Sequence, residues 1–142
     1  MKLYLSLGSN LGDRSGNITS ALAMLAGEFG VEPDRVSSMI ETRAEGFQGP
    51  DFVNAAALFI LPDNTDPHWI LDCCQKVEIA LGRPAHGIVT DGQGRRIYSS
   101  RSIDIDILLV DNQEISTERL TIPHPRMYQR DFVMIPLNEI IE

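Results

Sequence analysis

The sequence predicts an α+β fold in which helices cover a mainly antiparallel sheet. Several short segments have the alternation, or the apolar and hydroxyl content, of β-strands, and two longer segments have the periodicity of amphipathic helices. The chain has 142 residues, of which 43% are hydrophobic and 23% charged, as expected for one globular domain. We therefore expect a single domain over residues 1–142.

The first strand and the first helix are separated by a polar turn. Residues 2–7 alternate apolar and polar side chains, and residues 8–13 are of types that tolerate unusual backbone angles. The helix that follows has Ser15 or Asn17 as its cap and Gly30 as its end. Its buried stripe is formed by Ile18, Ala21, Leu22, Leu25 and Phe29.

Two strands and a second helix come next. Residues 36–42 and 52–61 are short and rich in apolar or hydroxyl side chains, and glycine and proline lie between them. Asp66 is a good helix cap with Pro67 at the first helical position, and Gly82 ends the helix. The buried stripe of this helix is formed by Ile70, Cys74, Val77 and Leu81.

The remaining chain predicts a long mobile loop, a strand and a last short helix. Residues 83–102 carry four glycines or prolines and little apolar periodicity, whereas residues 103–110 have the pattern of a strand. Residues 126–135 predict a helix that ends before Pro136. The whole order is that of a ferredoxin-like sandwich.

Charge and composition exclude several classes of partner. A net charge of −8 disfavours nucleic acid and anionic membranes, because both attract basic surfaces. No apolar run approaches the roughly 20 residues of a membrane span, so we expect a cytoplasmic protein. The adjacent Cys73 and Cys74 are best explained as reduced core residues. Residues 83–101 nevertheless contain four arginines and one acid, a local basic patch that suits a nucleotide phosphate chain.

Asp104 and Asp106 are the strongest candidates for chemistry. Side chains two apart on a strand point to the same face, so the two carboxylates should converge and could hold magnesium against a triphosphate. The alternative is a solvated strand face, which the Asp-x-Asp pattern alone favours. Arg83 and Arg101 near the pair shift the balance, because fixed cations would flank a phosphate bound to the metal.

Four blocks in order along the chain resemble one enzyme family. They are residues 8–14, residues 52–56, Arg101 with residues 104–108, and residues 119–127. Together these blocks resemble the 6-hydroxymethyl-7,8-dihydropterin pyrophosphokinase family of folate biosynthesis. The resemblance implies a ferredoxin-like α/β/α core, two magnesium ions, and transfer of diphosphate from ATP to the hydroxymethyl-pterin, with AMP as the second product.

The resemblance also implies roles for individual residues. Asp104 and Asp106 would ligate both metal ions, and Arg83 and Arg101 would face the phosphates. The ATP site would be lined by Gln75, Glu78, Ile107, Arg119, Thr121, His124 and Arg130. The pterin would be stacked between Phe52 and Phe132 and recognised by Asn54, with Gly8, Thr42 and Tyr98 completing its site. Without the resemblance, the two phenylalanines could equally be core residues.

Two alternatives to this function remain open. A different magnesium-dependent nucleotidyl or phosphoryl transferase would use the aspartate pair but not Asn54 and the two phenylalanines. A non-catalytic ferredoxin-like binding module would keep the fold without turning over ATP. We expect small-molecule substrates, a monomer, and no nucleic acid or membrane partner, while a contact with the next enzyme of the folate pathway stays open.

Overall fold

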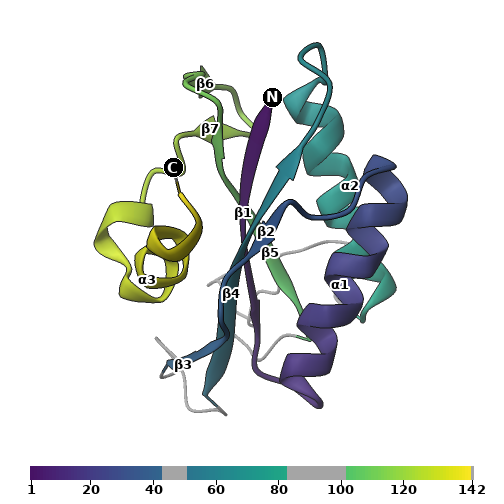
Figure 1. The fold of residues 1–142 in the computed structure, drawn as a ribbon, viewed down its shortest axis with the longest axis vertical. Coiled ribbons are helices and arrows are strands. Elements are labelled where there is room, and N and C mark those ends of the chain that lie inside the picture. Colours follow the sequence, from purple (N-terminus) through teal and green to yellow (C-terminus); the bar gives the residue numbers. More distant parts are fainter. Residues whose placement is uncertain (43–50, 83–101, 142) are drawn as a thin grey trace, which may run out of the picture.

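The described residues are built around an antiparallel sheet of five strands. The structure is a computed structural model that describes residues 1–42, 51–82 and 102–141 (Figure 1). The strands are β1 (Lys2–Ser9), β2 (Arg35–Val36), β3 (Ile40–Thr42), β4 (Phe52–Ile60) and β5 (Asp104–Val110). Their order is β2-β4-β1-β5, and β3 also pairs with β4. The predicted α+β class with a mainly antiparallel sheet is confirmed.

Helices cover both faces of this sheet. Helices α1 (Arg14–Phe29) and α2 (Pro67–Ala80) lie on one face, and α3 (Asp131–Ile140) lies on the other (Figure 1). A single 3₁₀ turn, η1 (Met127–Gln129), precedes α3. The short strands β6 (Ile115–Ser116) and β7 (Thr121–Ile122) form a separate hairpin that the sequence did not predict. The described part of the chain is thus the α/β/α sandwich that the sequence predicted.

Central strand β1 separates two apolar layers. Leu3, Leu5 and Leu7 are fully buried on the side of α1 and α2, where they join the larger core. Tyr4 belongs to the smaller core beneath α3, together with Leu58 and other apolar residues of β4, β5 and α3. Both faces of β1 are therefore covered, and its leucines alternate with residues that face the α3 side, where Ser6 and Gly8 follow Tyr4.

The first strand and the first helix differ slightly from their predicted limits. Gly8 and Ser9 continue β1 instead of opening the turn, because both pair with residues of β4. The cap of α1 is Asp13, whose carboxylate accepts a 3.0 Å hydrogen bond from the Gly16 N–H, so the prediction of Ser15 or Asn17 was wrong. The Asn17 amide instead donates to the Leu11 carbonyl oxygen at 2.8 Å. Gly30 ends the helix as predicted, with a φ of 73°.

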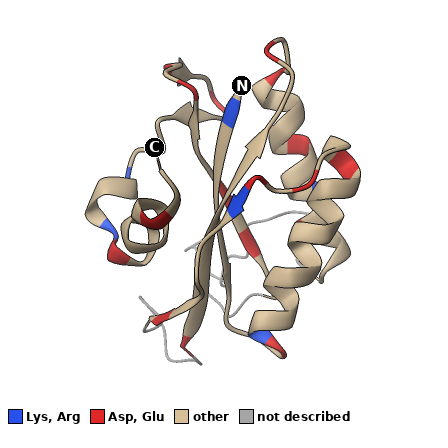
Figure 2. Ribbon diagram, viewed as in Figure 1, with Lys and Arg blue, Asp and Glu red and all other residues tan. Residues whose placement is uncertain are grey.

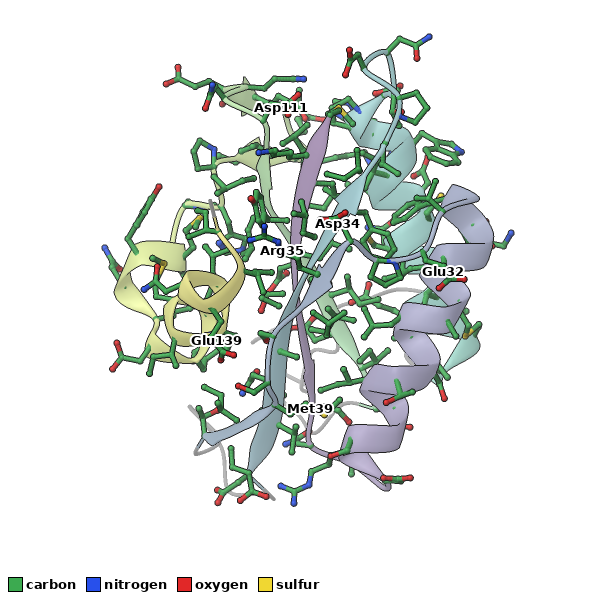
Figure 3. All side chains as sticks on the ribbon, viewed as in Figure 1. Glu32, Asp34, Arg35, Met39, Asp111 and Glu139 are labelled. Atoms are coloured by element: carbon green, nitrogen blue, oxygen red, sulfur yellow. The ribbon has the colours of Figure 1, made fainter. Side chains whose placement is uncertain are left out.

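The predicted strand over 36–42 is broken into β2 and β3. At the break, the Ser37 hydroxyl accepts a 2.8 Å hydrogen bond from the Ala56 N–H, while the Ser37 N–H donates to the Ala56 carbonyl oxygen at 2.9 Å. The Ser38 hydroxyl donates to the Glu139 carboxylate on α3 at 2.7 Å. Figure 3 shows Glu139 on α3 near the segment that carries Met39. The Ser37 hydrogen bonds therefore hold the break against β4, and the Ser38 hydrogen bond links it to α3.

The second helix has the predicted limits, whereas the last helix runs past its predicted end. The Asp66 carboxylate caps α2 by accepting a 2.9 Å hydrogen bond from the His68 N–H. Pro136 lies inside α3, although an interior proline typically costs about 3 kcal/mol. Val133, Leu137 and Ile140 are almost fully buried against the sheet, so tertiary packing holds the helix together across the proline.

Three further predictions concern segments and side chains outside the sheet. Cys73 and Cys74 are both free thiols buried in the core, and burial raises the pKa of each. The predicted long loop over 83–102 falls almost entirely outside the described residues. Within the described segments, none of the helices has the length and apolar character that crossing a bilayer requires. Figure 2 shows acidic residues over both helix layers and the β6–β7 hairpin.

Candidate active site

Three of the predicted site residues lie in one row across the sheet. Gly8 of β1 pairs with Asn54 of β4 on one side and with Asp104 of β5 on the other. In the next row, Ser6 pairs with Asp106. Because facing residues of an antiparallel pair share a face, this polar row lies on the α3 side of the sheet, beside the core that contains Tyr4. Residues distant in sequence thus meet on one face of the sheet.

The two aspartates are half-buried and share this face. Asp104 and Asp106 alternate along β5 with Ile105 and Ile107, which are buried in the opposite core. Two carboxylates on one face offer oxygen ligands, which magnesium prefers. Within the described residues, no cluster of three or more metal-ligating side chains exists. A metal held here would therefore depend on water or substrate oxygens for the rest of its shell.

Asn54 is held in a defined orientation. Its side chain is 3% exposed, and its amide nitrogen donates a 2.8 Å hydrogen bond to the Thr42 hydroxyl of β3. A Cβ atom at Gly8 would lie 2.8 Å from the Asn54 Oδ1 and 3.5 Å from the Phe52 ring. Only glycine therefore lets β1 approach these two side chains without displacing the amide.

The start of α3 brings a second aromatic ring and the basic side chain of Arg130 to the same face. Phe132 is half-buried against the core under α3, and the Arg130 guanidinium carbon lies 5.5 Å from the centre of its ring. That distance is within the range of a cation–π contact. Phe52 and Phe132 thus come from different elements, one at the start of β4 and the other at the start of α3.

His124 is fixed by its backbone and favours the neutral form. Its N–H donates to the Leu108 carbonyl oxygen at 3.0 Å, and its Nδ1 accepts a 3.3 Å hydrogen bond from the Arg126 N–H. Burial lowers the pKa of His124, the positive charge of Arg130 lowers it further, and Asp104 opposes the shift. With Nδ1 accepting, the ring proton is assigned to Nε2, which leaves one directed donor.

Most of the other predicted nucleotide-site residues lie on the α2 side of β5. The Glu78 carboxylate, 4% exposed, accepts a 2.9 Å hydrogen bond from the Ile105 N–H. Arg119 forms a 2.5 Å ion pair with Asp72 and donates to the Gln75 side-chain oxygen at 3.3 Å. Exposed Thr121 lies on β7, and buried Ile107 lies on β5.

The predicted residues therefore form two described groups, one on each side of β5. The α3-side group contains Gly8, Thr42, Phe52, Asn54, Asp104, Asp106, His124, Arg130 and Phe132, and the α2-side group contains Gln75, Glu78, Ile107 and Arg119. Thr121 is exposed on β7, two residues after Arg119. Arg83, Tyr98 and Arg101 lie outside the described residues. Asp72, the partner of Arg119, was not predicted, although its spacing of three from Gln75 on one helix places both on the same face.

Comparison with known proteins gives a consistent result. The chain matches the family described as 7,8-dihydro-6-hydroxymethylpterin-pyrophosphokinase (HPPK) over residues 4–142. It is 37% identical over 141 residues to a 2-amino-4-hydroxy-6-hydroxymethyldihydropteridine pyrophosphokinase of Bacillus subtilis, covering 98% of this chain and 77% of that protein. A protein of the same name from Porphyromonas gingivalis is 40% identical over 140 residues, with coverages of 97% and 89%.

Longer proteins also contain a related segment. The folate synthesis bifunctional protein of Arabidopsis thaliana is 31% identical over 141 residues, which cover 99% of this chain and 27% of that protein. A crystal structure of HPPK-DHPS in complex with substrates superposes with a TM-score of 0.66 at 14% identity, covering 99% of this chain and 40% of that one. At this identity the superposition supports the fold alone.

Proposed function

Because the chain belongs to the 7,8-dihydro-6-hydroxymethylpterin-pyrophosphokinase family, we propose that it transfers diphosphate from ATP to 6-hydroxymethyl-7,8-dihydropterin in a magnesium-dependent reaction. The observation that carries this proposal is the row formed by Asn54, Gly8 and Asp104. It puts a candidate pterin-reading amide and a candidate metal ligand on the same face, separated by one strand. The two substrates would therefore meet above the end of β1.

The donor set at Asp104 and Asp106 fits magnesium. The ion prefers oxygen ligands and keeps several waters or phosphate oxygens, so two carboxylates suffice as protein ligands. When bound, the metal would neutralise phosphate charge and orient the triphosphate. Asp104 and Asp106 would hold it from β5, a strand fixed between β1 and the Glu78 carboxylate. We propose that two ions share this pair.

The pterin would lie flat between Phe52 and Phe132. A planar heteroaromatic ring needs stacking faces and a few polar groups at its rim, and Asn54 supplies an oriented amide. The hydrogen bond to the Thr42 hydroxyl occupies part of the amide nitrogen's donor capacity and fixes the direction of the amide oxygen. Gly8 would leave room for the ring edge, and Tyr98 would complete the site.

ATP would lie along β5, where the second group of residues could contact it. Gln75, Glu78, Ile107 and Thr121 would line the nucleotide, while Arg119, His124 and Arg130 would meet its polar and charged parts. His124 would donate from Nε2 as a neutral ring. Arg83 and Arg101 would add positive charge against the phosphates, which matters because phosphoryl transfer depends mainly on positioning and charge stabilisation.

The chemical step would join the pterin hydroxymethyl oxygen to the β-phosphorus of ATP. The bond between the β-phosphorus and the oxygen bridging to the α-phosphate breaks, AMP leaves with that oxygen, and the hydroxyl proton is released. Stacking on Phe52 and Phe132 would orient the hydroxymethyl group in line with the broken bond. Positive side chains would stabilise the charge that spreads over the phosphate oxygens.

The test is pterin-dependent formation of AMP in a mixture of protein, magnesium, ATP and the hydroxymethyl-dihydropterin. We expect AMP only in the complete mixture, and the Asp106→Asn variant should lose turnover far more than pterin binding. Asp34→Asn is the matched control, because Asp34 is an exposed acid next to β2 (Figure 3). AMP formation without pterin would favour a different transferase, and absence of all turnover would favour a binding module.

A contact with the next enzyme of folate synthesis is a further part of this proposal. Support comes from longer proteins in which a related segment makes up 27% of the Arabidopsis bifunctional protein and 40% of the HPPK-DHPS chain. We expect the chain to be a monomer by itself, so light scattering with and without that enzyme would reveal the association. A mass that never changes on mixing would contradict the contact.

A further inference from the structure

Arg14 joins the first turn of α1 to two separate strands. Its guanidinium donates a 2.8 Å hydrogen bond to the Asp51 carbonyl oxygen, directly before β4, and a 3.1 Å hydrogen bond to the Glu41 carboxylate on β3. Two different nitrogens make these contacts, so one planar group bridges both strands. The start of α1, the end of β3 and the start of β4 lie at the same end of the molecule (Figure 1).

This bridge acts on the face of the sheet opposite to the candidate pterin site. Thr42 pairs with Phe52 and Glu41 pairs with Val53, whose side chain is buried in the core beneath α1. Successive side chains on a strand alternate between faces, so Glu41 points toward α1 whereas Thr42 points toward Asn54 and the α3 side. Among the described residues, the hydrogen bonds of Arg14 therefore go to neighbours of the site residues and not to the site residues themselves.

We propose that Arg14 is a positioning residue for the pterin, which it serves by holding the ends of β3 and β4 in register from behind the sheet. This inference rests on the proposed function, because it assumes that Phe52 and Asn54 bind the substrate. Each of these residues lies within three positions of the Asp51 carbonyl that Arg14 holds. The Asn54 partner, Thr42, directly follows the other contact, Glu41.

The bridge should increase the fraction of molecules in which the ends of β3 and β4 are paired and the pterin site can bind. Strand ends fray, and β3 has only three residues paired to β4. If a site is competent for only part of the time, the apparent dissociation constant rises by the inverse of that fraction. Losing the bridge should therefore weaken pterin binding, while ATP contacts near β5 stay intact on the other side of β1.

The experiment compares steady-state kinetics of Arg14→Met with those of the parent protein. We expect the KM for the pterin to rise about five-fold, corresponding to a competent fraction of roughly one fifth, with the KM for ATP changed less than about two-fold. The pterin KM of Arg14→Lys should lie between those of the parent protein and Arg14→Met, because an ammonium group cannot reproduce the two directed hydrogen bonds of the planar guanidinium. Glu41→Met should raise the same constant, and combining it with Arg14→Met should add less than the sum of the single effects.

The matched control is Lys76→Met. Lys76 pairs with Glu28 at 2.9 Å between α2 and α1, so this variant also removes a surface ion pair that joins two elements. It should leave the pterin KM unchanged. Equal effects of Lys76→Met and Arg14→Met, or a change in Arg14→Met confined to thermal stability, would overturn the positioning role.

One further variant separates this inference from the function on which it rests. Asn54→Ala should raise the pterin KM directly. If Asn54→Ala raises it and Arg14→Met does not, the positioning role is wrong and the proposed pterin site stands. If neither variant changes the pterin KM, or if the parent protein forms no pterin-dependent AMP, both the proposed site and the positioning role fail.

Discussion

The contact between Gly8 and Asn54 leaves no room for a methyl group. In Gly8→Ala the new Cβ would lie 2.8 Å from the Asn54 Oδ1, so the amide would have to move. Because misplacing a substrate-positioning group by even about 1 Å can reduce rates by orders of magnitude, we expect a loss of roughly tenfold or more in kcat/KM for the pterin. Steady-state kinetics would measure this loss.

Gly27→Ala is the control for that substitution. Gly27 lies inside α1, and a Cβ there would meet nothing within 4 Å. Alanine should therefore stabilise the helix by about 0.5–1 kcal/mol and leave activity unchanged. Similar kinetic losses in both variants would contradict the steric explanation for Gly8.

His124 gives the folded state a specific pH dependence. Its pKa lies below the ordinary value of 6.5 because of burial and the charge of Arg130, so the folded protein binds fewer protons here than the unfolded chain. The stability contributed by the neutral ring is fully present above 6.5 and is lost as the pH falls through the folded pKa.

Thermal unfolding of the parent protein and His124→Gln across that range would reveal this contribution. We expect the melting temperature of the parent to fall more steeply below pH 6.5 than that of the variant, which has no ring to protonate. The measurement should be made without nucleotide, so that binding does not alter the comparison. Parallel curves for the two proteins would rule out His124 as the source.

At the scale of single elements, α1 shows how one cap defines a helix. Asp13→Ala removes the carboxylate that accepts from the Gly16 N–H and should cost about 1 kcal/mol of unfolding free energy. Ser15→Ala is the informative control, because the sequence predicts Ser15 or Asn17 as the cap, whereas in the structure Ser15 is exposed inside the helix. Urea unfolding of both variants distinguishes them, and a larger loss for Ser15→Ala would contradict the cap.

Elements with local signals were predictable, and those that depend on distant contacts were not. Helix α2 was predicted from Asp66 and Pro67, because a cap and a first-turn proline act within a few residues. The break between β2 and β3 depends on a hydrogen bond from Ala56 to Ser37, which the sequence around Ser37 does not reveal. Helix α3 continues through Pro136 because of burial against a sheet formed by other parts of the chain.

At the scale of the whole molecule, strand register decides which residues meet. The alternation of Asp104 and Asp106 predicted that they share a face of a strand. It did not predict that Asp104 lies opposite Gly8 and thereby one strand away from Asn54. Motif resemblance named these residues separately, but their common row follows only from the pairing of β4, β1 and β5, which joins segments far apart in the sequence.

Ligand binding should stabilise the whole fold through the aspartate pair. A ligand at about 100 times its dissociation constant stabilises the folded state by about 2.7 kcal/mol, so magnesium with a non-hydrolysable ATP analogue should raise the melting temperature. Chelation of magnesium should remove the increase, and Asp104→Asn should reduce it. An increase of the same size in the presence of chelator would contradict a role for the metal in nucleotide binding.

The Glu78 carboxylate has a consequence for how the protein behaves at high concentration. Strand β5 ends the sheet order in the described part of the chain, and an edge strand with unpaired N–H groups can template pairing with another copy. Because the Glu78 carboxylate accepts the hydrogen bond of the Ile105 N–H, this N–H is not available to pair with another copy. A strand that approached this position would also meet a negative charge. The side chain proposed to line the nucleotide site thus also occupies one donor at the edge of the sheet.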